Sequence, residues 1–327
     1  MKHKSKFKGT TYSKGLSGRT HDYVKYVRPM TGKLLRGLGL DINFVDGHQD
    51  TLIAKIDNEE IEITDLTGGY GTNLLGHKNP DLLEVAKQSL SNGAPNNTQG
   101  AIRTSAAQLA EKLSEVIEKE TSRGHWITQF SNSGSEAVEA SLKATQIYFE
   151  KRKKKLAQYI NLSKNTLTRV INHNLDLGID CSEYLRKAGV PITLGEINDY
   201  YNHLEDFIST IGPELVSLKG GYHGKTLGAI SLNGNNKFRE YFQGISNSHI
   251  VNKDKQSLNK LFKETDHTLR LFCPKSLNWA EISFSSLAGF YIEPIQGEGG
   301  VFELEKDSVK YIRQETCSRE ILLISDE

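Results

Sequence analysis

Five short apolar runs, separated by stretches with helical spacing, constrain the fold of this chain more than any other feature. The runs are His125–Phe130, Leu215–Leu218, His249–Val251, Gly289–Ile292 and Ile321–Ile324. A strand that is apolar along its whole length is buried on both faces, as happens when helices cover a parallel sheet from both sides. The sequence therefore predicts an α/β fold whose large domain is a doubly wound, mostly parallel sheet.

A smaller unit is expected before this sheet. Residues 53–66 alternate apolar and polar side chains in two short runs, which predicts a hairpin. A helix is expected to begin at Pro80, because proline suits the first turn, and another over Thr104–Glu120. We expect residues 1–78 to be the amino-terminal part of a small α+β domain, and residues 79–327 to be the large domain.

One charged stretch, Lys151–Gly212, does not fit the alternation of runs and helices. It opens with consecutive basic residues, which we interpret as the solvated face of a long helix, although contact with nucleic acid or an anionic carrier would be another use. Pro191 and Gly195 are expected to divide the stretch into two or three helices.

The overall composition points to an ordinary cytoplasmic protein. The chain is 37% hydrophobic and 25% charged with a net charge of +1, which favours neither nucleic acid nor a membrane as a partner. No apolar stretch of about 7–15 residues follows the basic amino terminus, as a signal peptide would require. Cys181, Cys273 and Cys317 lie far apart without metal-ligand spacing, so no metal site is expected.

Three groups of residues could carry chemistry. Ser133 and Glu136 fit a capping box that opens a helix after the first apolar run, and the helix start at Gly134 and Ser135 could hold a phosphate with its backbone N–H groups. Many helices begin in this way and bind nothing. Residues 220–226 follow the second run with glycines flanking an aromatic residue and a histidine, which is also the pattern of a structural strand-to-helix turn.

The third group is acidic. Glu293, Glu298 and Asp326 follow two apolar runs, and open α/β sheets bind ligands at the carboxyl ends of their strands. A carboxylate beside a pyridine ring would keep the ring nitrogen protonated, so that the ring could withdraw electrons from a carbanion. From its position alone, Asp326 is an ordinary acid at the end of a strand.

In this order, the blocks resemble the class III aminotransferases, which use pyridoxal 5′-phosphate (PLP). The blocks are residues 65–77, 132–137, 221–226, 293–300 and 326–327, and the resemblance extends from about Ile53 to the last residue.

The resemblance implies a role for each candidate in binding the cofactor. Gly134 and Ser135 would hold the phosphate of PLP, Tyr222 would stack on the pyridine ring, and His223 would lie beside the ring. Asp326 would be the partner of the pyridine nitrogen.

The acids of the 293–300 block have other implied roles. Glu293 would belong to the hydrogen-bond shell around the ring, and Glu298 resembles the glutamate that pairs with a substrate-side arginine in some members. The implied reaction moves an amino group from an amine or amino acid to an oxo acid or aldehyde, in a homodimer.

The chain departs from the family pattern in two ways. The 90 positions between Asn132 and Tyr222 are more than is usual, so we interpret 151–212 as an insertion. It resembles additions in aminotransferases of assembly lines, which implies docking of a carrier protein. The second departure is that the Schiff-base lysine of the family is expected beyond Glu327, and Lys219 and Lys225 stand in the wrong motif to replace it.

The resemblance therefore identifies no catalytic residue within these 327 positions and implies a truncated large domain, as in a fragment. Two alternatives remain open. One is a different PLP reaction on the same fold, such as that of an aminomutase, racemase or decarboxylase. The other is an inactive PLP-binding remnant that serves as an interaction protein.

Overall fold

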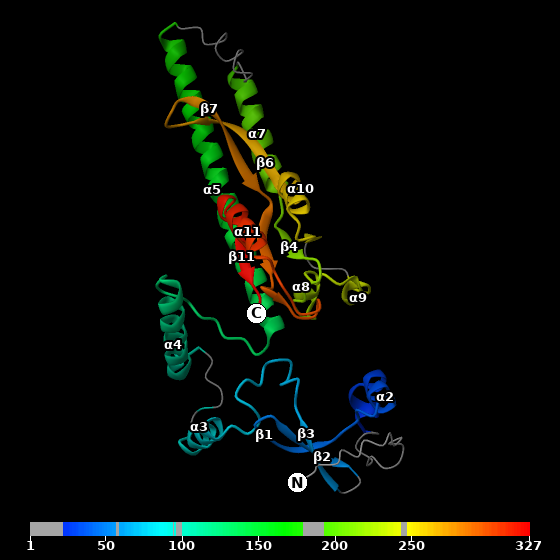
Figure 1. Cartoon of the computed structure of the whole chain (residues 1–327). Coiled ribbons are helices and arrows are strands. Elements are labelled where there is room, and N and C mark those ends of the chain that lie inside the picture. The colour runs from blue at the N-terminus through cyan, green and yellow to red at the C-terminus, as the bar shows by residue number, and fades with distance from the viewer. Residues whose placement is uncertain (1–21, 57–58, 94, 96–99, 179–192, 243–246) are drawn as a thin grey trace. The chain divides into compact units, whose positions relative to one another are not determined.

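The computed structural model describes residues 22–56, 59–93, 95, 100–178, 193–242 and 247–327. The chain divides into two compact units, residues 1–112 and 113–327 (Figure 1). The domain bounds expected from the sequence, 1–78 and 79–327, stay a prediction.

The first unit contains a small antiparallel sheet. Its elements are a π-helical turn η1 (Tyr23–Val27), α2 (Pro29–Gly37), β1 (Phe44–His48), β2 (Thr51–Ile56), β3 (Glu59–Thr64) and α3 (Pro80–Ser91), and α4 (Thr104–Thr121) crosses into the second unit. Strands β1, β2 and β3 pair in chain order, which confirms the hairpin, whose turn at 57–58 lies outside the described residues. Helix α3 begins at Pro80 as expected, with the Asn79 side chain accepting from its first amides.

The second unit is built on a parallel sheet. Its elements are α5 (Gly134–Asp176), α7 (Leu194–Thr210), β4 (Glu214–Leu218), α8 (Leu227–Ile230), α9 (Asn236–Arg239), β5 (Asn247–Val251), α10 (Lys255–Thr265), β6 (Asp266–Cys273), β7 (Asn278–Ser285), β8 (Leu287–Ile292), β9 (Ile295–Gln296), β10 (Phe302–Glu303), α11 (Lys306–Ser318) and β11 (Leu322–Ser325). The four strands in the order β11-β8-β4-β5 are all parallel. Four of the five apolar runs are thus confirmed as strands of one sheet.

The fifth run, His125–Phe130, was wrongly expected to be a buried strand. It pairs with no strand within the described part of the chain, and its apolar side chains face solvent: Ile127 is 90% and Phe130 is 47% exposed. A strand exists only where a neighbouring backbone supplies its hydrogen bonds, and apolar composition does not reveal whether such a neighbour is there.

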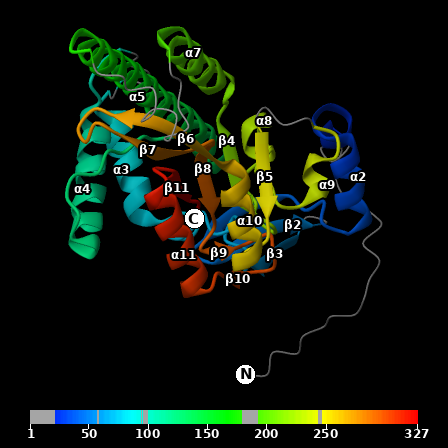
Figure 2. The ribbon, with the colours of Figure 1, turned by 90° about the horizontal axis from the view of Figure 1, so that it is seen from above.

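Helices cover the parallel sheet on both faces (Figure 2). On one face, α5 packs against the sheet in a cluster that includes Leu142 and Leu215. On the other face, α10 and α11 contribute Phe262 and Ile312 to a second cluster, which includes Val216. Neighbouring residues of β4 therefore belong to different cores, as a strand buried on both faces requires.

The charged stretch continues the helix that covers the sheet. Helix α5 runs without a break to Asp176, and α7 lies beside it (Figure 1). The interpretation of the basic run as a solvated face holds only in part, because Arg152 is buried and Lys153 donates to the carbonyls of Ser209 and Ile211 at 2.9 and 2.8 Å.

The expected division of the stretch into two or three helices is confirmed by α5 and α7, but the break does not lie at Gly195. Gly195 is the second residue of α7, which instead begins with a capping box at Thr193. A glycine in the first turn of a capped helix is tolerated, since the cap fixes where the helix begins. The other expected break, Pro191, lies outside the described residues.

The antiparallel hairpin β6–β7 was not expected from the sequence. It packs against helices α5 and α7. Tyr200 of α7 donates to the Arg270 carbonyl at 2.6 Å, and its ring contacts that of Trp279 edge to face. The charged stretch therefore shares one core with a β-hairpin that lies far from it in the sequence.

Candidate functional site

Polar and glycine-rich segments meet at the carboxyl ends of β4, β8 and β11. The loop after β4 contains residues 219–226, the segment after β8 contains residues 293–300, and Asp326 follows β11 directly. Because these strands are parallel neighbours, their carboxyl ends lie at the same edge of the sheet.

His223 and Asp326 form the central pair of this edge. His223 Nδ1 lies 2.7 Å from Asp326 Oδ2, while the His223 side chain is 1% and the Asp326 side chain 25% exposed. The second ring nitrogen, His223 Nε2, is buried and has no hydrogen-bond partner among the described residues. A buried polar atom without a partner is costly, and such atoms mark places where a ligand can supply the missing bond.

Backbone contacts hold the loop that carries His223. Asn233 accepts from the His223 N–H at 2.7 Å and donates to the Gly224 carbonyl at 2.8 Å. Gly224 has φ of +119°, and a Cβ atom there would lie 2.9 Å from Ser135 Cβ. The absence of a side chain at Gly224 thus allows the loop to lie directly against the beginning of α5.

The beginning of α5 is capped by side chains. The Ser133 hydroxyl accepts from the Glu136 N–H at 3.3 Å, and the Glu136 carboxylate accepts from the Asn132 N–H at 2.7 Å. This differs from a standard capping box, in which the glutamate bonds the N–H of the cap residue itself. Gly134 and Ser135 follow the cap, so their N–H groups precede the first intrahelical bond, from Ala137 to Ser133.

Tyr222 and Glu293 are linked through the backbone. Glu293 accepts from the Tyr222 N–H at 2.7 Å and from the Gly297 N–H at 3.4 Å. Burial raises the pKa of Glu293, and the nearby Asp326 carboxylate raises it as well. The Tyr222 ring contacts the Phe238 ring at 5.5 Å between centroids, and burial raises the pKa of the phenol.

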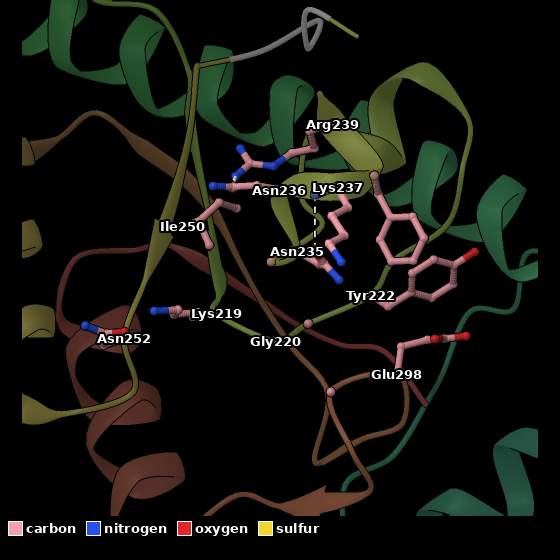
Figure 3. A pocket seen from close by; sticks show the side chains of 14 residues that line it. Lys219, Gly220, Tyr222, Asn235, Asn236, Lys237, Arg239, Ile250, Asn252 and Glu298 are labelled. Atoms are coloured by element: carbon pink, nitrogen blue, oxygen red, sulfur yellow. Dashed lines mark hydrogen bonds between the residues drawn. The ribbon is translucent and has the colours of Figure 1, made fainter. Parts of the chain in front are cut away.

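A cavity of about 840 Å³ opens beside Tyr222. Figure 3 shows Tyr222 and Glu298 on one side of it, and Lys219 with Asn252 on the other. The lining also includes Lys237 and Arg239. Basic side chains outnumber acidic ones, so the cavity favours an anionic or strongly polar ligand.

Glu293 should make the stability of the second unit depend on pH. Its raised pKa means that the ionised carboxylate costs the folded state stability above that pKa, whereas below the unfolded pKa the acid is neutral in both states and the cost vanishes. We expect Glu293→Gln, which keeps an acceptor for the Tyr222 N–H, to raise the free energy of unfolding at pH 7.5 and to leave it unchanged near pH 3.5. Urea titrations at both pH values measure this, with the exposed Glu303→Gln as control. An equal gain at both pH values would contradict the assignment.

The structure brings together most residues singled out in the sequence. Ser135, His223, Asp326, Tyr222 and Glu293 are joined by the contacts described above. Gly134 adjoins this group at the exposed start of α5. The exposed Glu298 lies apart from the His223 pair, at the cavity, and its charge raises the pKa of the Tyr222 phenol.

Two supporting residues escaped the sequence analysis. Asn233 holds the histidine loop, and Glu139 accepts from the N–H groups of Gly228 and Ala229 at 2.8 and 3.3 Å, which fixes α8 against α5. No motif marks either residue, because each acts across the fold. Within the described ranges, no group of three or more His, Cys, Asp or Glu side chains is arranged to hold a metal ion, and no helix has the length and apolarity to cross a bilayer.

Comparisons with known proteins agree on one family. The family model described as "Aminotransferase class-III" matches residues 43–327. "Aminotransferase PigE" of Serratia sp. is 25% identical over 308 residues, covering 93% of this chain and 26% of that protein. The acetylornithine aminotransferase of Aquifex aeolicus is 25% identical over 300 residues, covering 88% of this chain and 54% of that protein. The chain thus spans about half, or less, of the length of these relatives.

Solved structures share the fold. A transaminase from the marine bacterium Virgibacillus superposes with a TM-score of 0.59 at 17% identity, over 94% of this chain and 55% of that one. A PLP-bound amine transaminase from an uncultivated Pseudomonas species gives a TM-score of 0.54 at 19% identity, over 88% and 52% of the two chains. These similarities confirm the α/β architecture expected from the sequence.

Proposed function

Because this chain belongs to the class III aminotransferase family, we propose that the edge of the sheet around His223 and Asp326 binds PLP and serves transfer of an amino group. The observation that carries the proposal is the pair itself. A carboxylate held by a buried histidine stands at the end of a parallel strand, where it can face a cationic ring nitrogen.

The residues present fit the cofactor in charge. PLP bears a phosphate and, when its pyridine is protonated, a cation at the opposite side of the ring. The capped start of α5 offers backbone N–H groups for an anion, and Asp326 offers a carboxylate for the cation. At Gly224 the loop that carries His223 lies against the start of α5, and the buried Nε2 of His223 has no partner among the described residues, so donors for an anion and an acceptor for a cation belong to the same edge of the sheet.

Each candidate residue then has a role in holding the cofactor. Gly134 and Ser135 would bind the phosphate, and Asp326 would stabilise the protonated ring nitrogen, with His223 orienting the carboxylate through Nδ1. Tyr222 would stack on the ring; its main chain is fixed by Glu293. When bound, PLP supplies the electron sink that amino-group transfer needs.

The substrates we propose are an amine or amino acid and an oxo acid or aldehyde. Support comes from the cavity beside Tyr222, whose basic lining suits a carboxylate-bearing substrate. Glu298, at its margin, is exposed and free to pair with an arginine or a substrate ammonium group.

Pyridoxamine 5′-phosphate tests the proposed cradle without any covalent anchor. We expect saturable binding to the 327-residue chain by equilibrium dialysis, and a loss of affinity of about tenfold or more in Asp326→Asn, since a hydrogen bond to a charged group is worth about 1.5–3 kcal/mol. Asp307→Asn, at an exposed carboxylate of α11, is the matched control. Pyridoxamine without its phosphate should bind more weakly. Equal affinities for the two variants would contradict the assignment of Asp326.

Amino-group transfer is tested separately from binding. Protein loaded with pyridoxamine 5′-phosphate is mixed with a set of oxo acids, and the amino acid formed in a single turnover is measured by mass spectrometry. Product would support an aminotransferase. Saturable binding without product from any oxo acid or aldehyde would instead favour the reading as a PLP-binding remnant.

Two partners and a location complete the proposal. We propose a homodimer, as is usual in the family, which analytical ultracentrifugation would contradict by showing a monomer at micromolar concentration. A carrier protein docking on residues 151–212 is supported by the length of this stretch and by the exposed Lys151 and Lys154. Unchanged transfer to a carrier-bound acceptor after charge reversal of both lysines would rule out this docking.

The near-neutral composition supports a cytoplasmic location, which cell fractionation tests.

A further inference from the structure

A second pocket lies far from the edge of the sheet around His223 and Asp326. It is formed by α5, β7 and the turn before β11. Its volume is about 430 Å³. Apolar side chains form most of its walls: Leu156, Tyr159, Leu162, Ile282 and Phe284. The volume lies within the range of about 300–1,000 Å³ that is usual for sites that take small molecules.

One of the residues that line this pocket is a buried cation. Arg152 is 7% exposed and donates to the carbonyls of Leu287 at 2.9 Å and Ser285 at 3.1 Å. Its guanidinium also lies over the Phe284 ring, 4.9 Å from the centroid. Its Nε is buried and has no partner among the described residues.

Arg152 has no ion-pair partner within the described part of the chain. Its carbonyl partners satisfy donors but carry no net charge, and the two nearest carboxylates, Glu320 and Asp266, lie beyond ion-pair distance although both act to raise its pKa. Burying a cation without a counter-ion is costly, and burial accordingly lowers the pKa of Arg152. Lys155, about one helical turn further along α5, brings a second positive charge to the lining, and because it is exposed this charge is screened by water as that of an exposed acid would be.

An apolar pocket with an uncompensated cation is complementary to one class of ligand. From this geometry we infer that the pocket binds an amphipathic monocarboxylate, that is, a compact apolar body with one carboxylate directed toward Arg152 and Lys155. The apolar body would gain from leaving water, and the carboxylate would supply the missing counter-charge at low dielectric.

Glu320 is the one acid in the lining, and it limits this complementarity. It is exposed at the turn before β11, so water and salt screen its charge more strongly than that of the buried Arg152. The Glu320 carboxylate still acts on Arg152, because its negative charge raises the pKa of the arginine. Removing the charge of Glu320 should therefore strengthen the binding of an anion.

Three probes of the same shape and different charge test the inference. They are 1-naphthoate, neutral 1-naphthamide and cationic 1-naphthylmethylammonium, whose binding to the full 327-residue chain is measured by fluorescence anisotropy. We expect naphthoate to bind at least tenfold more tightly than naphthamide, and the cation to bind weakest. Equal affinities for all three, or no saturable binding of naphthoate, would overturn the inference.

A matched pair of lysine variants locates the site. Lys155→Met should weaken naphthoate several-fold and leave naphthamide unchanged, whereas Lys154→Met, its exposed neighbour outside the lining, should change neither. Glu320→Gln should tighten naphthoate alone. None of these variants removes Arg152, so the fold is retained, as circular dichroism would verify. Equal losses in the two lysine variants would place the ligand elsewhere and contradict the proposal.

Discussion

Replacing Gly234 by alanine should destabilise the second unit by about 3 kcal/mol, at the upper end of the usual cost of overpacking. A Cβ atom at Gly234 would lie 2.7 Å from the Leu218 carbonyl oxygen and 2.8 Å from the Gly221 nitrogen, and closer still to the Gly220 nitrogen. All three are backbone atoms at the end of β4, so no side-chain rotation can relieve the clash. Because the displaced segment leads directly to Tyr222 and His223, affinity for pyridoxamine 5′-phosphate should fall as well.

Gly297→Ala is the control for this substitution. Gly297 belongs to the same edge of the sheet, but a Cβ atom there would meet nothing within 4 Å. Urea titrations of both variants, followed by circular dichroism, should show a lower midpoint for Gly234→Ala only. If the two variants had the same midpoint, the close approach at the end of β4 would be wrong.

Tyr201→Ala should cost about 3–5 kcal/mol, the range observed when a large buried aromatic side chain is truncated. Tyr201 is fully buried in α7, and its hydroxyl lies 2.6 Å from the Ser163 hydroxyl of α5. It belongs to the same cluster as Leu215 and Tyr291 of the parallel sheet. We therefore expect the charged stretch and the sheet to unfold together, in one transition shifted to lower urea.

Two further variants separate the contribution of the Tyr201 hydroxyl from that of its ring and provide a control. Tyr201→Phe removes only the hydroxyl, which also accepts from the Phe272 N–H at 3.5 Å, and should cost about 1–3 kcal/mol because buried hydrogen-bond partners are left unsatisfied. Tyr241→Ala, at a side chain that is 84% exposed, should leave the midpoint unchanged. A separate early transition in Tyr201→Ala, with the sheet unaffected, would show that the charged stretch folds independently of the sheet.

The strands of the parallel sheet could be predicted because burial on both faces leaves a direct trace in composition. The runs at Leu215–Leu218 and Gly289–Ile292 contain few polar side chains, and both are central strands. The run at His125–Phe130 also contains large apolar side chains, together with Thr128 and Gln129, but within the described residues it pairs with no strand. Composition reports how apolar a segment is, whereas a strand also depends on a partner whose position is set by the rest of the fold.

The hairpin β6–β7 was missed for the opposite reason. Its strands include charged residues such as Arg270 and Glu281, because parts of both strands face solvent. Period-two alternation with mixed chemistry resembles many loop sequences, and the packing of the hairpin on α7 is a long-range contact that no local pattern encodes.

The candidate site was predicted from local motifs, and its internal connections were not. The residues at strand ends and at the capped start of α5 could be selected because parallel strands place their carboxyl ends together. The His223–Asp326 pair joins positions 103 apart, and the Tyr222–Glu293 contact joins positions 71 apart. Only the folded chain determines which acid meets which loop.

Helix α5 constrains how this protein can change in evolution. At about 1.5 Å per residue, its 43 residues extend roughly 65 Å from the start beside Gly224 to the end of the charged stretch. Its buried positions, such as Leu142, Phe149 and Leu156, recur in step with the helical turn. Insertion of one residue before Arg152 would rotate the rest of the helix by about 100°. Arg152 and Ile160 would then leave the core. We therefore expect length changes within the packed part of α5 to come as near-whole numbers of turns, such as about seven or eleven residues, and not as one or two residues.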